Sequence, residues 1–221
     1  MSARSSSNQH LVVACAISLG VAVCVYAAWL AQPLIDPALP VWTSFVSELA
    51  ARGRPGSVLM RLGDAFAACA VLVCAWTGHR ARLIAAPFGL LMVAFSVFTL
   101  LDAMFPMACA PSVSETCRRG DEAMTLGVSH FIHTFTSSLA NAATVAAAGL
   151  WAWIRLRRGR LGLPAAIGVV LGLSHILTAV ITGILALVHA ETVGAWQRAS
   201  LVFLSTWAII ALACSVKDNR S

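Results

Sequence analysis

The stretch LIAAPFGLLMVAFSVFTLLDAMF, residues 83–105, contains a single charged residue, Asp102. At about 1.5 Å of rise per residue, a helix of this length is about 34 Å long, which is enough to cross the hydrocarbon core of a bilayer. A helix also satisfies all of its backbone hydrogen bonds internally, as lipid requires. The stretch therefore predicts a transmembrane helix.

Further apolar stretches of similar length predict an all-α, polytopic bundle of six transmembrane helices. The expected spans lie near residues 10–32, 57–78, 83–105, 124–154, 163–188 and 195–215. Composition agrees, because 59% of the residues are hydrophobic, 11% are charged and the mean hydropathy is +0.84. The first apolar run, of about 20 residues, is longer than the core of a cleaved signal peptide, so we expect it to remain as a helix. We expect residues 1–221 to form one membrane domain.

Basic residues are shared unevenly between the two sides that these spans define. Nine of the 15 lysines and arginines fall in the N-terminus, the second and fourth loops and the C-terminus, with the densest run, RLRRGR, at 155–160. Because basic residues stay in cytoplasmic loops, we expect both termini in the cytoplasm and the protein in the bacterial inner membrane. The net charge of +6 then reflects topology and affinity for anionic membrane lipids. Nucleic acid is not an expected partner, since phosphate-binding glycine loops and basic patches interleaved with aromatic residues are missing from the sequence.

Two of the seven cysteines lie outside the spans, in the loop ACAPSVSETCRRG. Cys109 and Cys117 are eight residues apart, and the expected topology puts their loop on the outer face, where disulfides persist. We expect a disulfide that closes a small loop over the ends of the third and fourth spans. Two free thiols are the alternative. The pair alone does not match a zinc site, which needs about four ligands.

Ionisable residues inside the spans are the best guide to function, because they usually face the bundle interior. In the second span, Arg61 and Asp64 are three residues apart and are expected to pair on one helix face. Asp102 ends the third span, where simple solvation is the alternative to a functional role. Polar residues at intervals of three and four predict a polar stripe on the fourth span: His130, His133, Thr134, Ser137, Asn141 and Thr144.

The fifth span carries a second polar stripe, which ends at the same expected outer surface. Its members are His175, Thr178, Thr182 and His189. Together with residues of the outer loops and the last span, these side chains predict one pocket near the outer leaflet. Its expected members are Glu48, Asp64, Asp102, His130, His133, His189, Glu191 and Arg198.

The first hypothesis for this pocket is a metal-dependent lipid hydrolase. Two histidines three residues apart on a helix, with a carboxylate on a neighbouring helix, can hold Zn²⁺ and leave a position for a reactive water. The metal ligands would be Asp102, His130 and His133, and the general base would be Glu48 or Glu191. Interhelical hydrogen bonding by the histidines is the structural alternative.

Two other functions fit the same residues. One is noncatalytic binding or transport of a lipid or small amphiphile, with Arg198 meeting an anionic head group; the expected binding residues are Asp64, His189, Trp196 and Arg198. The other is electron transfer by a haem, whose axial ligands would be His130 or His133 together with His175 or His189. If neither applies, the polar stripes serve helix packing alone.

Short motifs along the chain resemble those of a known family. They are the string SEL at 47–49, Asp102 followed by Pro106, His130 near the start of the fourth span, and the Gly194 and Arg198 pair that opens the last span. This combination resembles the uncharacterised prokaryotic six-span family called domain of unknown function 998, which implies a six-helix membrane protein and no established reaction. A fainter similarity links the Ser, Asp and His pattern to the alkaline ceramidase and adiponectin-receptor hydrolases, which hold zinc through histidines. Their final-helix His-x-x-x-His pair is missing from this sequence.

Overall fold

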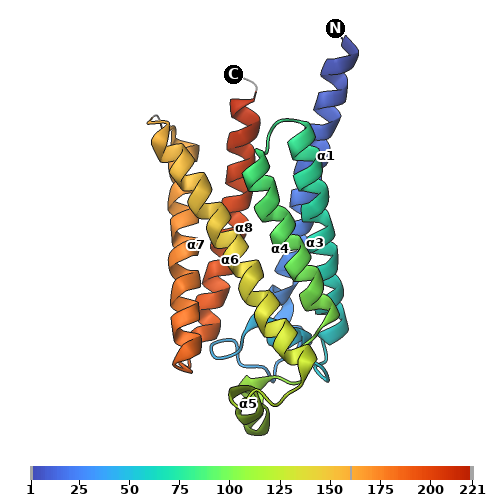
Figure 1. The fold of residues 1–221 in the computed structure, drawn as a ribbon, viewed down its shortest axis with the longest axis vertical. Coiled ribbons are helices and arrows are strands. Elements are labelled where there is room, and N and C mark those ends of the chain that lie inside the picture. Colours follow the sequence, from blue (N-terminus) through green and yellow to red (C-terminus); the bar gives the residue numbers. More distant parts are fainter. Residues whose placement is uncertain (1, 160, 220–221) are drawn as a thin grey trace.

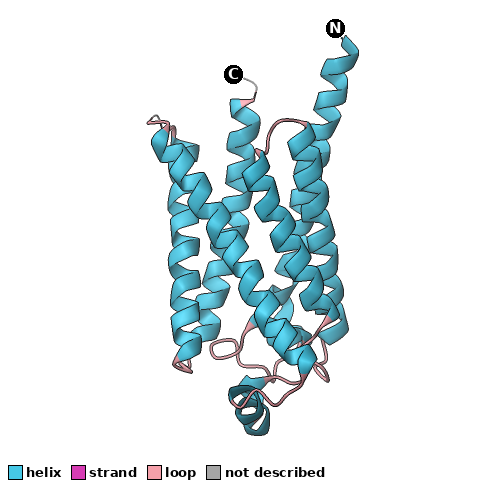
Figure 2. Ribbon diagram, in the orientation of Figure 1, coloured by secondary structure: helices cyan, strands magenta, loops and turns pink. Residues whose placement is uncertain are grey.

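The structure, a computed structural model, describes residues 2–159 and 161–219, and helices account for the fold of this part of the chain (Figure 1). Six long helices form the bundle: α1 (Ser2–Tyr26), α3 (Ser57–Arg80), α4 (Ala86–Met104), α6 (Val128–Arg157), α7 (Leu163–Leu187) and α8 (Val193–Asp218). The described residues include no strand (Figure 2). Each long helix is apolar enough to cross a membrane, and the first span continues from α1 to Ile35. The prediction of an all-α bundle with six membrane-length helices is confirmed.

The long helices are arranged in chain order around a ring. Contacts join α1 to α3, α3 to α4, α4 to α6, α6 to α7 and α7 to α8, and the ring closes between α8 and α1, where neighbouring helices are packed most sparsely. The two termini lie at one end of the bundle, which we call the terminal end (Figure 1). An even number of spans requires this arrangement. Which side of the membrane this end faces stays a prediction.

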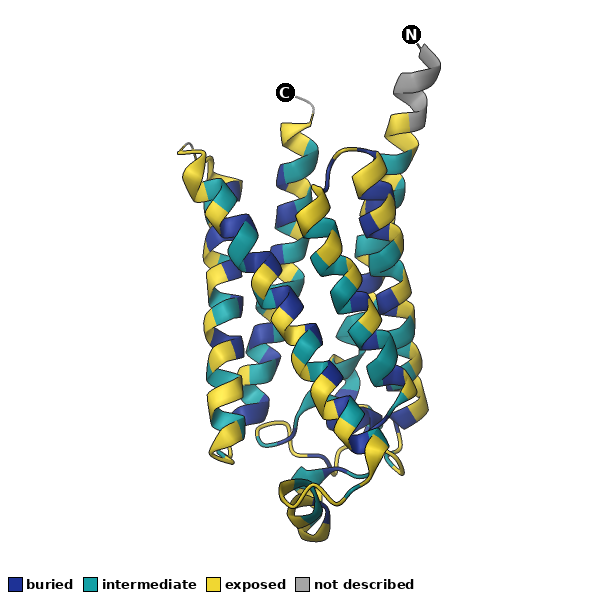
Figure 3. Ribbon diagram, in the orientation of Figure 1, coloured by how far each residue is buried: buried dark blue, intermediate teal, exposed yellow. Residues whose placement is uncertain are grey.

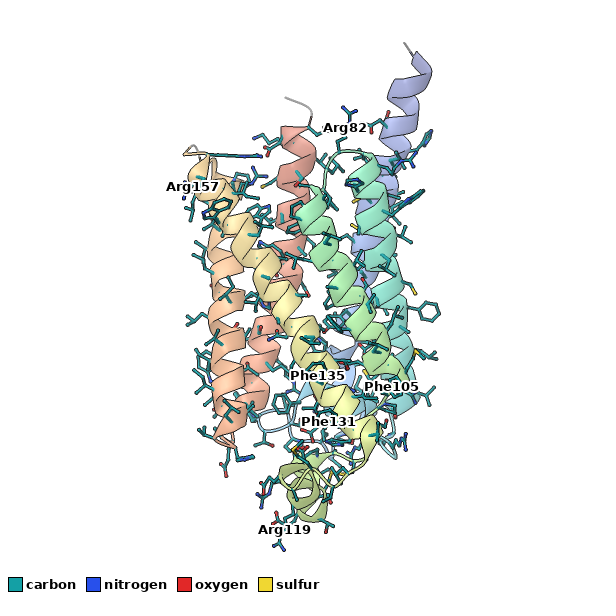
Figure 4. The ribbon with its side chains drawn as sticks, viewed as in Figure 1. Arg82, Phe105, Arg119, Phe131, Phe135 and Arg157 are labelled. Carbon is teal, nitrogen blue, oxygen red and sulfur yellow. A yellow bond between two sulfur atoms is a disulfide. The ribbon has the colours of Figure 1, made fainter. Side chains whose placement is uncertain are left out.

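Large apolar side chains cover the outside of the ring, while small residues fill much of its inside. Phe131 and Phe135 of α6 are exposed on the outward face, where a bilayer would meet them (Figure 4). The opposite face of the same helix is buried (Figure 3). Half of its buried residues are alanines, including Ala143 and Ala147. Small residues let helices approach closely in lipid, so this pattern explains why α6 packs between α4 and α7.

Two connecting segments form a cap on the bundle at the end opposite the termini. The cap consists of residues 36–56, which contain the 3₁₀ helix η2 (Val46–Ala50), and residues 105–127, which contain η3 (Pro111–Val113) and α5 (Glu115–Glu122). The short helices η1 (Ala27–Ala31) and α2 (Gln32–Ile35) lead from α1 into the cap. The cap includes a disulfide between Cys109 and Cys117, as the loop spacing predicted.

Candidate ligand-binding cavity

Glu48 joins the two segments of the cap. Its side chain is 1% exposed, and its carboxylate accepts hydrogen bonds from the Phe45 amide at 2.9 Å, from the Ser112 amide at 2.9 Å and from the Ser112 hydroxyl at 2.6 Å. Burial raises the pKa of Glu48, against the opposing effect of these donors. The geometry therefore gives Glu48 a structural role as a clamp between the two cap segments. Its role as a general base stays a prediction.

Arg198 fastens the start of α8 to the cap. Its guanidinium donates to the carbonyl oxygens of Ser44 at 2.7 Å and Gly194 at 3.0 Å, and to the side-chain oxygen of Gln32. A Cβ on Gly194 would collide with backbone oxygens of the cap, so glycine permits this close approach. Arg198 is buried, and three of its five N–H donors bind protein oxygens, so the structure gives it a role in fixing the cap. Its contact with an anionic head group stays a prediction.

The two histidines of the expected zinc site face different partners. His130 lies in the first turn of α6, where its Nδ1 accepts from the Ala108 amide at 3.1 Å and its Nε2 lies 3.0 Å from an Asp121 carboxylate oxygen. His133 instead faces Asp102, with Nδ1 3.7 Å from Oδ1. Within residues 2–159 and 161–219, no group of three His, Cys, Asp or Glu side chains is placed to hold a metal ion. Asp102, His130 and His133 are thus not brought together as ligands.

The two remaining histidines of the haem hypothesis differ in burial and in their partners. His175 is fully buried, and its ring nitrogens lie 2.9 Å from the Ser200 hydroxyl and 3.0 Å from the Thr144 hydroxyl. It therefore ties α7 to α8 and to α6, and neither nitrogen is available to iron. His189 lies in the turn after α7, at a positive φ of 52°, with its side chain exposed and 3.9 Å from Glu122.

A cavity of about 960 Å³ opens between the cap and the middle of the bundle. All long helices contribute to its lining, together with both cap segments. The expected pocket residues that line it are Glu48, Asp64, Asp102, His133, His189 and Glu191. The other three predicted site residues, His130, Trp196 and Arg198, are not part of this lining. The structure thus gathers most of the predicted outer pocket around one space.

Asp64 and Asp102 are the acidic groups on the membrane-spanning walls of this cavity. The expected ion pair between Arg61 and Asp64 does not form, because Arg61 donates to the Ala103 carbonyl on α4 at 2.7 Å. Among the described residues, Asp64 has no hydrogen bond or ion pair, and it lies near enough to Asp102 for electrostatic repulsion. Asp102 accepts from the Thr136 hydroxyl and, at 2.5 Å, from the Ser137 hydroxyl. Asp64 is therefore an unpaired carboxylate inside the bundle.

Aromatic side chains complete the same wall and were not predicted from the sequence. Tyr26 and Phe95 meet edge to face, with ring centroids 6.1 Å apart, and Trp29 also lines the cavity. Tyr26 is the only tyrosine in the chain, and this is the one feature of the sequence that could have marked it as a candidate site residue. Tyr26 lies near both Asp64 and Asp102, within reach of the electrostatic field of their carboxylates. The cavity wall therefore combines two carboxylates with aromatic rings.

A family model described as a protein of unknown function, DUF998, matches residues 18–214. The chain belongs to this family. Comparison with curated proteins and with solved structures finds no match. In this DUF998 protein the motif residues have distinct places: Glu48 and Arg198 fix the cap, and Asp102 faces the cavity. The motifs therefore describe both the closure of the cap and the wall of the cavity beneath it.

Proposed function

We propose that this DUF998 protein binds an amphiphile with a cationic head group, with the head held between Asp64 and Asp102. In this proposal the protein lies in the bacterial inner membrane with both termini in the cytoplasm, so the cavity opens toward the outer leaflet. The observation that carries the proposal is the unpaired Asp64 carboxylate on the cavity wall, near a second carboxylate.

Electrostatics supports a cationic head group. A carboxylate removed from water is costly unless a partner compensates it, and two neighbouring carboxylates add repulsion to that cost. A bound ammonium group would offset both effects. The nearby rings of Tyr26, Phe95 and Trp29 favour the same ligand, because aromatic faces attract cations, and quaternary ammonium groups in particular.

The remainder of the cavity supports an apolar body on that head group. Its size of about 960 Å³ is near the upper end of ordinary ligand pockets, which span roughly 300–1,000 Å³. Apolar residues of several helices contribute to the lining, among them Val25, Met60 and Leu201. An amphiphile can fill such a space with its chain while its cation reaches Asp64.

Equilibrium binding of dodecyltrimethylammonium to protein in phosphatidylcholine nanodiscs tests the proposal. Asp64→Asn should weaken binding by at least about tenfold, or about 1.4 kcal/mol, because the charge partner of the head group is lost. Glu191→Gln is the matched control, since it removes one acidic charge from an exposed lining residue in the turn between α7 and α8 and should change binding little. Neutral dodecanol should bind wild type and Asp64→Asn alike. Equal binding of the cation by Asp64→Asn and Glu191→Gln would refute the proposal.

A further inference from the structure

A second cavity, of about 560 Å³, lies toward the terminal end of the bundle. Residues of α1, α3, α4, α6 and α8 line it, and the lining is mostly apolar, with Leu19, Phe88 and Trp151 as examples. It shares with the first cavity only Tyr26, Phe95, Thr144 and Leu204. The Tyr26 and Phe95 ring pair therefore lies where the two cavities meet, and the two spaces have different chemistry on its two sides.

Cationic side chains surround the far end of this second cavity. Its lining includes Arg82, Arg155 and Arg158, and also one acidic residue, Asp218. Arg155 donates to Asp218 at 2.7 Å, and Arg158 lies 3.4 Å from the same carboxylate oxygen. Arg82 lies in the turn between α3 and α4, where its backbone amide donates to the His79 carbonyl at 3.0 Å. Its guanidinium has no hydrogen bond or ion pair to the described residues, and Figure 4 shows it at the terminal end of the bundle. The three arginines outnumber the one carboxylate at this end.

We propose that this second cavity holds an acyl chain of an anionic membrane lipid, and that the lipid head group binds Arg82 and Arg155 at its rim. The site is distinct from the one proposed for the cationic head group and does not depend on it. An apolar cavity with a basic rim matches both parts of an anionic lipid, since the chain is removed from water and the head group meets positive charge.

The packing of the ring provides a route for such a chain. The junction between α1 and α8 is the most sparsely packed one in the ring, and both helices contribute lining residues, including Val23 and Leu212. A lipid beside this junction can pass its chain between the two helices without leaving the hydrocarbon layer. The cavity volume of about 560 Å³ is within the range of roughly 300–1,000 Å³ typical of ligand pockets.

Native mass spectrometry of the detergent-purified protein, mixed with equal amounts of dioleoylphosphatidylglycerol and dioleoylphosphatidylcholine, tests this site. Wild type should retain the anionic lipid preferentially. Arg82→Gln and Arg155→Gln should each reduce that retention by about fivefold, because a basic residue near anionic lipid contributes an attraction of that order. Asp218→Asn should increase retention, since the carboxylate that competes for Arg155 is removed.

Arg157→Gln is the matched control. Arg157 lies on the same end of α6, but its guanidinium stacks on the exposed Trp153 ring at 5.3 Å, and it is not part of the cavity lining (Figure 4). Ala208→Phe provides a test that leaves every charge in place, because a larger side chain at this lining position takes up part of the cavity. It should reduce retention of the anionic lipid while the protein still melts cooperatively.

Three results would overturn the proposal. The first is equal retention of the two lipids by wild type. The second is equal loss in Arg157→Gln and Arg155→Gln, which would indicate general surface attraction. The third is full retention by a folded Ala208→Phe variant, because the chain would then lie outside the cavity.

Discussion

Replacing Glu48 by alanine should destabilise the protein through its cap. The substitution removes the acceptor of the Phe45 amide, the Ser112 amide and the Ser112 hydroxyl in a place where Glu48 is 1% exposed. Each buried donor left without an acceptor costs about 1–3 kcal/mol, and the hydroxyl can rotate to another partner. The two amides should therefore lower the free energy of unfolding by about 2–4 kcal/mol. The loss stays below the maximum for two donors because partial opening of the cap admits some water. For a chain of this size, that is a fall of about 5–15 °C in melting temperature.

Thermal unfolding in detergent, followed with a dye that becomes fluorescent on reaction with buried thiols, measures this effect. Cys15, Cys74 and Cys214 are buried and free, so they report global unfolding once the exposed free cysteines, Cys24 and Cys69, have been replaced by serine. The control is Glu115→Ala on the exposed surface of α5, which should melt close to wild type because exposed ion pairs contribute little.

A double-mutant cycle separates the stability contributed by the hydrogen bond between Glu48 and Ser112 from the effect of removing a buried charge. Glu48→Ala and Ser112→Ala should couple by about 1.5–3 kcal/mol, the usual strength of a hydrogen bond to a charged group. A Glu48→Ala variant that melts like wild type, or an additive cycle, would refute the structural role and return Glu48 to the list of candidate catalytic groups.

Further consequences follow from the cap and its connections. Burial raises the pKa of Glu48, so protonation of Glu48 adds stability that is complete below its ordinary pKa of 4.5 and is lost as pH rises through the raised pKa; the hydrogen bonds to the ionised form remain, and melting temperature should fall over that range in wild type and less in Glu48→Gln. Gly194→Ala should prevent α8 from packing on the cap and lower the melting temperature, whereas Gly183→Ala, with open space at its Cβ, should leave it equal or higher. Reduction of the disulfide between Cys109 and Cys117 should lower the melting temperature of wild type, and a Cys109→Ser variant should be insensitive to the reductant.

The fold was largely predictable because lipid imposes a simple rule on the sequence. Six apolar stretches of membrane-spanning length leave the chain few alternatives to six helices, and polar residues at helical intervals must face inward. This reasoning predicted that Asp102 and His133 share one pocket, and both line the cavity beneath the cap. It also placed Asp64 and Glu191 there, although they are more than 120 positions apart in the chain.

The individual partners were less predictable, because they depend on which helices become neighbours. Arg61 and Asp64 have the spacing of an ion pair, yet Arg61 reaches a carbonyl of α4 and leaves Asp64 unpaired. His130 and His133 share a helix face, but the first turn of α6 packs under the cap, so His130 bonds there. Hydropathy also does not encode the order in which the helices are arranged in the bundle. That order is what brings the side chains of Tyr26 and Phe95 into contact.

The most direct test of the central claim is the location of a bound cation within the bundle. A long-chain ammonium carrying a diazirine beside its nitrogen can be cross-linked by light in nanodiscs, and its adducts mapped by mass spectrometry. The account predicts labelling of the cavity wall at Asp64, Tyr26 or Phe95, with loss of that labelling in Asp64→Asn. Labelling confined to lipid-facing residues such as Phe66, and unchanged in Asp64→Asn, would contradict it.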